Sequence, residues 1–119
     1  DWAALTGEDG TALGFMAHGG NGAISVTSNV APKLCSEFQT ACLAGDFQRA
    51  LELHELLMPL HDALFVETNP APVKYAAWRL GLIESPECRL PLAPVMDATK
   101  KAVDAALAGA RLLKAIAAE

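Results

Sequence analysis

The feature that most constrains this sequence is a pair of short β signals that flank a helical one near its start. A run at 2–6 leads into the turn cluster at 7–10. The β-branched run at 23–27 follows the glycine-rich turn at 19–22. The apolar stretch between them, 11–18, predicts a short helix. A strand, a helix and a strand in this order predict a βαβ unit with parallel strands and a right-handed crossover.

A parallel pair of strands leaves two unpaired edges and needs cover on both faces. The remainder of the sequence predicts helices, so this sheet has no third strand within the 119 residues. We therefore expect neighbouring strands that the sequence does not contain. The sequence also begins with Asp1 instead of methionine, inside an expected structural element, which is typical of a fragment.

Local signals divide the rest of the chain into helices. Pro32 suits the first turn of a helix, and Gly45 suits the position just after its end. Asp46 is a suitable N-cap for a long helix that follows, and Asp97 for the last helix. The sequence thus predicts an α/β beginning and a helical remainder.

Composition excludes several classes of partner. Nine basic residues against fourteen acidic ones give a net charge of −5, which argues against a nucleic-acid surface. The apolar stretches are interrupted well before the roughly 18 to 20 residues of a membrane span, and no secretion signal is recognisable. The three cysteines, Cys35, Cys42 and Cys88, show no paired spacing. They predict free thiols in the cytoplasm.

The turn Gly7-Glu8-Asp9 is the first candidate for a functional site, because loops after parallel strands often carry one. The same residues could equally form a turn whose acids favour a helix N-terminus. The Gly19–Gly22 turn precedes a strand and does not open a helix, so it predicts a tight connection and not a phosphate loop.

Histidines and lysines give no catalytic centre. His54 and His61 are seven residues apart, which is too far for a helical metal pair, and we expect half-buried helix residues and no metal site. A lysine that forms a Schiff base would need a desolvated position, yet none of the five is expected on a strand. The lysines are Lys33, Lys74, Lys100, Lys101 and Lys114.

Several motifs in order along the chain closely resemble the C-terminal portion of the dihydrodipicolinate synthase (4-hydroxy-tetrahydrodipicolinate synthase) family. They are Leu-Thr-Gly-Glu-Asp at 5–9, the run from His18 to Pro32, Leu-Met-Pro-Leu-His at 57–61, Asn-Pro-Ala-Pro-Val-Lys at 69–74 and Arg-Leu-Pro-Leu at 89–92. The resemblance favours this family over sister aldolases such as N-acetylneuraminate lyase.

The resemblance implies a fold class, α/β, in which the chain is the end of a (β/α)8 TIM barrel followed by a C-terminal helical domain. Residues 1–45 would hold strands seven and eight, around 3–6 and 23–26, with the seventh and eighth helices. Residues 46–119 would form the helical domain. The missing N-terminal barrel portion would supply the neighbouring strands.

The resemblance also implies a lyase that condenses pyruvate with aspartate 4-semialdehyde on the way to diaminopimelate and lysine. Family members form a lysine Schiff base with pyruvate and need no cofactor. They are commonly homotetramers. The Schiff-base lysine belongs to the preceding part of the family sequence, so no catalytic residue is expected in this chain.

Three substrate-binding positions carry over from the family. Ile24 matches a position whose backbone contacts pyruvate, and Gly7 matches a glycine that lines the site. Asp9 matches a carboxylate near the second substrate. Glu8 departs from the commoner Gly-Asp-Asp form of this turn.

An alternative is a non-catalytic helical oligomerisation module or a proteolytic fragment. Ala106, Ala110 and Ala117 would form a small-residue face on the last helix, which permits close helix approach.

Overall fold

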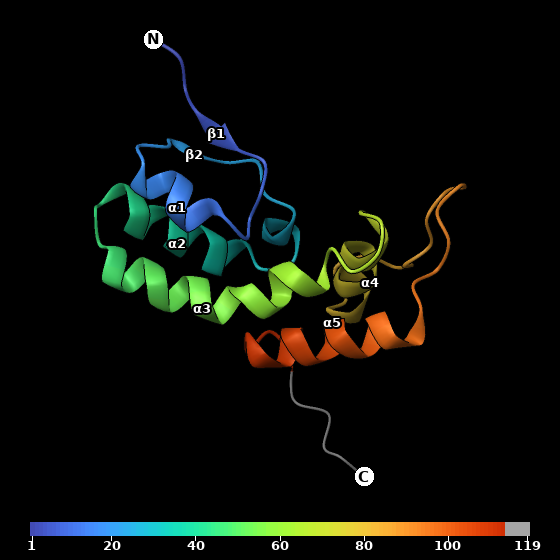
Figure 1. The fold of residues 1–119 in the computed structure, drawn as a ribbon. Helices are drawn as coiled ribbons and strands as arrows, with labels where there is room; N and C mark the ends of the chain where they lie inside the picture. The colour runs from blue at the N-terminus through green and yellow to red at the C-terminus, as the bar shows by residue number, and fades with distance from the viewer. Residues whose placement is uncertain (114–119) are drawn as a thin grey trace.

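The computed structural model describes residues 1–113, and Lys114 and Ala117 lie outside these described residues. Figure 1 shows a two-stranded sheet at one end, α1 and α2 between that sheet and α3, and α4 and α5 near the far end of α3. The elements in chain order are β1 (Leu5–Thr6), α1 (Ala12–Ala17), β2 (Gly22–Ala23), the 3₁₀ turn η1 (Thr27–Asn29), α2 (Pro32–Leu43), α3 (Phe47–Ala63), α4 (Ala71–Arg79) and α5 (Asp97–Gly109).

The predicted βαβ order is confirmed, and β1 pairs with β2 in parallel. Leu5 lies opposite Gly22 and Thr6 opposite Ala23. Each strand is shorter than the sequence predicts. Before β2, the backbone N–H of Asn21 donates to the Ala4 carbonyl at 2.8 Å, and the side-chain Oδ1 of Asn21 accepts from the N–H of Ala4 at 2.9 Å.

The other end of the ladder is limited by a turn that the sequence does not reveal. Val26 already has helical dihedral angles, φ −80° and ψ −45°, and Thr27 begins η1. The prediction that 23–27 is strand is therefore wrong at its end. The reason is tertiary, because the N–H groups of Val26 and Thr27 turn towards the carboxylate of Asp9.

The glycine-rich connection is a tight turn between α1 and β2, as predicted. Gly19 has φ +96°, a conformation that L side chains rarely adopt. A Cβ on Gly20 would collide with the ring of Phe15. Both glycines are needed for the chain to reverse in so little space.

Helices α2 and α3 form a hairpin whose ends follow the sequence signals. Gly45 has φ +72°, and its N–H reaches the Cys42 carbonyl at 3.1 Å. The N–H of Asp46 reaches the Ala41 carbonyl at 2.9 Å, which completes a Schellman motif. The carboxylate of Asp46 then accepts from the N–H of Arg49 at 3.1 Å and caps α3. The roles predicted for Gly45 and Asp46 are confirmed.

The predicted cap of the last helix is wrong by one residue. The N-cap is Met96, which has an extended backbone. Its N–H donates a hydrogen bond to the Glu67 carboxylate at 3.0 Å. Asp97 lies inside the first turn of α5, and its carboxylate pairs with Lys100 at 2.9 Å in solvent. A carboxylate that is engaged at the surface does not reach back to cap the helix.

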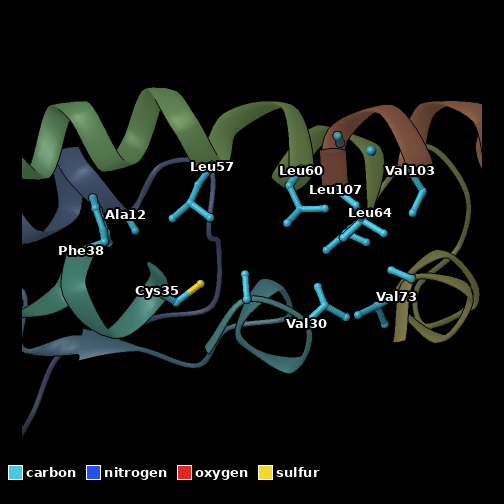
Figure 2. Packing of buried hydrophobic residues seen from close by; sticks show 14 of the residues in the cluster. Ala12, Val30, Cys35, Phe38, Leu57, Leu60, Leu64, Val73, Val103 and Leu107 are labelled. Atoms are coloured by element: carbon cyan, nitrogen blue, oxygen red, sulfur yellow. The ribbon is translucent and has the colours of Figure 1, made fainter. Parts of the chain in front are cut away.

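Helix α3 carries the core that joins the two ends of the molecule. Its buried side chains pack with α1 and α2 along one part of the helix and with α5 along another. Figure 2 shows Leu57 near Cys35 of α2, and Leu60 and Leu64 near Leu107 of α5. Ala106 and Ala110 of α5 are buried as well. Two of the three alanines in the proposed oligomerisation face therefore pack within the chain.

Candidate functional site

The candidate site lies where the chain leaves the two strands. β1 leads into the turn at 7–9, and β2 leads into the loop at 24–27. Parallel strands bring their carboxyl ends to the same edge, so these two segments are neighbours. The N–H of Ile24 bonds the Thr6 carbonyl at 2.8 Å and fixes the start of the second segment against the first.

Asp9 ties the two segments together. Its side chain is 7% exposed. Its Oδ2 accepts from the N–H of Val26 at 2.9 Å and from the N–H of Thr27 at 3.1 Å. Hydrogen bonds to a carboxyl group are stronger when that group is charged than when it is neutral. Asp9 therefore determines where the loop after β2 turns.

Gly7 and Ile24 occupy open positions beside this link. A Cβ on Gly7 would meet nothing within 4 Å. The Ile24 side chain is 72% exposed, and the apolar side chains of Trp2 and Leu5 are also exposed. Glu8 is exposed, and its Oε1 accepts from the Gly10 N–H at 3.1 Å, which serves the turn itself. The structure thus brings Gly7, Asp9 and Ile24 to one edge of the sheet.

A contact that the sequence did not predict joins this edge to α3. The hydroxyl of Thr27 lies 2.7 Å from Nδ1 of His61, and the two residues are 0% and 6% exposed. The sequence predicts half-buried histidines at His54 and His61, which fits His54, but His61 is buried. Its position between Leu57 and Leu64 on the apolar stripe of α3 is the signal that could have indicated burial.

Residues 1–113 contain no group of three or more histidine, cysteine, aspartate or glutamate side chains that could hold a metal ion. Burial lowers the pKa of His61 from its ordinary value of 6.5, against the charge of Asp9, which acts to raise it. We therefore expect a neutral imidazole in the folded protein at neutral pH.

A cavity of about 230 Å³ lies behind the loop, between β2, α2 and α3. Its polar lining includes Asp9, Ser25, Cys35, Gln39 and His61. Burial, with the charge of Asp9, raises the pKa of Cys35 to about 11. Cys35 is thus a protonated, unreactive thiol. All three cysteines are free, as predicted.

The lowered pKa of His61 predicts a pH dependence of stability. Below pH 6.5 the unfolded chain takes up a proton that the folded chain resists, so the free energy of unfolding falls as the solution is acidified. We expect His61→Leu to flatten this part of the profile, measured by urea unfolding at several pH values. His54→Leu is the control, because it keeps the burial of His61, which is the largest cause of the lowered pKa. An unchanged slope in the His61 variant would contradict the assignment.

The chain has a parallel βαβ unit, two neighbouring loops at the carboxyl ends of its strands, and helices after them. This arrangement is typical of a segment of an α/β protein, a class in which binding sites lie at the carboxyl edge of the sheet. The model of the Dihydrodipicolinate synthetase family matches residues 1–110. The chain belongs to this family, and the resemblance drawn from its motifs is confirmed.

Curated relatives match nearly the whole chain. The 4-hydroxy-tetrahydrodipicolinate synthase of Rhizobium meliloti is 58% identical over 113 residues, which are 95% of this chain and 38% of the relative. The enzyme of the same name from Parvibaculum lavamentivorans is 59% identical over the same shares. The chain therefore spans just over a third of the length of these relatives.

Solved structures agree with this picture. Dihydrodipicolinate synthase from Thermotoga maritima superposes with a TM-score of 0.91 at 42% identity, over 95% of this chain and 38% of that one. A structure described as the first monomeric dihydrodipicolinate synthase variant gives 0.90 at 41% identity, over 94% and 37%. The helix-rich chain with its two-stranded sheet thus has the fold of one part of these enzymes. No helix among residues 1–113 is long and apolar enough to cross a membrane.

Proposed function

We propose that this chain is the C-terminal portion of a 4-hydroxy-tetrahydrodipicolinate synthase, a lyase that condenses pyruvate with aspartate 4-semialdehyde in lysine and diaminopimelate biosynthesis. The observation that carries the proposal is the 58% identity to a synthase of that name over 95% of the chain. The family match over residues 1–110 supports it.

In this proposal β1 and β2 are strands seven and eight of a (β/α)8 barrel, α1 and α2 are the seventh and eighth helices, and residues 46–119 form the helical domain. The exposed apolar side chains Trp2, Leu5 and Ile24 support this placement. A sheet of two short strands does not bury them, whereas earlier barrel strands and the barrel interior would.

Gly7 and Ile24 would line the pyruvate site at the mouth of the barrel. Gly7 leaves room for a substrate because it has no side chain and no neighbour at its Cβ position. Ile24 would contribute its backbone, whose place is set by its bond to Thr6. Asp9 lies at the same mouth, near the second substrate. Because its Oδ2 already accepts two backbone N–H groups, it would act mainly by fixing the loop that carries Ile24.

The reaction needs an amine that the described residues do not offer. Lys33, Lys74, Lys100 and Lys101 all lie on helices, and Lys74 donates to the carbonyl of Glu87. In the proposed reaction a lysine of the preceding barrel portion adds to the ketone of pyruvate, and water leaves. Loss of a methyl proton gives an enamine, whose carbon attacks the aldehyde, and cyclisation frees the lysine.

Borohydride trapping tests this assignment. The complete polypeptide that the gene of this chain encodes should gain a reduced pyruvate adduct when treated with pyruvate and borohydride, and intact mass spectrometry should detect it. The 119-residue chain by itself should gain none. Samples without pyruvate or without borohydride are the controls. An adduct on the isolated chain would show that the nucleophile has been misplaced.

The cytoplasmic location that the free cysteines predict and the homotetramer that the resemblance implies are part of the same proposal. The alternative, a non-catalytic helical module, needs a face that is free for a partner. Ala106 and Ala110 are buried within the chain, which favours the enzyme over the module. The native mass of the gene product separates them, because a polypeptide of roughly 250 residues or more fits a barrel enzyme and one near 12.5 kDa fits the module.

A further inference from the structure

His61 reaches from α3 to the loop that follows β2. Helix α3 begins after the βαβ unit and its covering helix α2 have ended, so His61 belongs to the helical part of the chain. Its Nδ1 lies 2.7 Å from the hydroxyl of Thr27, across 34 positions of sequence. Both residues are buried, and a hydrogen bond that water does not reach keeps its full electrostatic strength.

The loop that receives this contact is held from two directions. On one side, Asp9 accepts the N–H groups of Val26 and Thr27. On the other side, the Thr27 side chain meets His61. Ile24 precedes this anchored pair by two residues, and its own N–H is bonded to Thr6. The backbone from Ile24 to Thr27 is thus fixed at three points, one of which lies on α3.

We propose that His61 is a positioning residue, which holds the backbone of the Ile24–Thr27 loop in place for substrate through its hydrogen bond to Thr27. This rests on the proposed function, in which that backbone contacts pyruvate. The helical part of the chain then contributes to the substrate site although it supplies no group that touches the substrate. Small displacements of such a contact are costly, since catalysis depends on orientation.

The same helix provides a matched comparison. His54 lies two turns earlier on α3 and is partly buried, but its Nδ1 has no hydrogen-bond partner among the described residues. Replacing His54 removes an imidazole from the same apolar stripe without breaking a bond to the loop. The change in kinetics of the His54 variant therefore measures the effect of losing a histidine from this helix without losing a bond to the loop.

The test uses the complete gene product and steady-state kinetics with pyruvate as the varied substrate. In His61→Leu we expect KM for pyruvate to rise about tenfold with kcat within about threefold of the parent, because the loop acts in binding. His61→Asn should recover most of the affinity, since its side-chain amide places a polar atom close to the Nδ1 position. His54→Leu should leave KM unchanged.

A second pair of variants keeps the test independent of folding in His61→Leu. Thr27→Val preserves shape and removes the hydroxyl, and it should raise KM for pyruvate as much as His61→Leu does. Thr27→Ser keeps the hydroxyl and should stay close to the parent. The double variant Thr27→Val with His61→Leu should be no worse than either single one, because both break the same bond.

The outcomes separate this inference from the proposed function. If the unsubstituted gene product forms no pyruvate adduct, the proposed function fails and the role of His61 in it falls with it. If the parent is active but His61→Leu and Thr27→Val keep the parent KM, or if His54→Leu raises KM equally, the positioning role alone is overturned.

Discussion

Asp9→Ala is expected to lower the free energy of unfolding by about 3 kcal/mol, because it leaves two backbone N–H groups of the β2 loop without an acceptor. Val26 and Thr27 would then lose the interaction that turns the chain out of β2. In the complete gene product we also expect the largest loss of kcat/KM for pyruvate among the variants described, since the Ile24 backbone would move with the loop. Urea unfolding and initial-rate kinetics measure the two effects.

Two further variants define this prediction. Asp9→Asn keeps a carbonyl acceptor but loses the charge, so we expect a smaller loss of stability than in Asp9→Ala. Glu8→Gln is the matched control, because Glu8 is exposed and keeps its acceptor for Gly10 after the change. Its free energy of unfolding should stay within about 0.5 kcal/mol of the parent. An Asp9→Ala variant as stable as Glu8→Gln would show that the carboxylate does not hold the loop.

Leu60→Ala is expected to destabilise the protein by about 2 to 5 kcal/mol, the range for a buried leucine that leaves a cavity. Leu60 is 0% exposed and lies in the core near Leu64 and Leu107, as Figure 2 shows. The loss would fall at the junction of α3 with α5, within the helical part of the chain. The midpoint of urea unfolding measures it.

Leu51 provides the control for this second prediction, because it lies on the same helix and is 40% exposed. Leu51→Ala removes the same atoms and should cost less than about 1 kcal/mol, since the site is half open to water. Equal losses in the two variants would contradict the central place given to Leu60 in the core.

Local signals in the sequence were sufficient for much of the fold. Pro32, Gly45 and Asp46 mark the ends of α2 and the start of α3, and the structure places all three as predicted. These signals act over a few residues, through a fixed φ, a left-handed turn or a side chain that reaches its own helix. The family resemblance rests on several such motifs in order, and the family match confirms it.

The candidate site was predictable only in part. The order of strand, helix and strand is enough to place the turn with Gly7 and Asp9 at the carboxyl edge of a parallel sheet, whereas Ile24 was singled out by the family resemblance. It does not reveal that Asp9 turns inward to the N–H groups of Val26 and Thr27. The sequence left two readings of this acidic turn open, and it predicted a strand that extends through Thr27.

The sequence by itself determined the order of the elements, the parallel pairing of the strands and the family to which the chain belongs. These follow from periodicity, caps and motifs, which are properties of residues close together in the chain. Only the tertiary structure decided the bonds of Asp9 and the meeting of Thr27 with His61. The 3.6-residue repeat of α3 indicates which face of the helix is buried. Which polar group lies opposite His61 depends on how segments that are distant in the sequence pack together, and no local sequence pattern determines that contact.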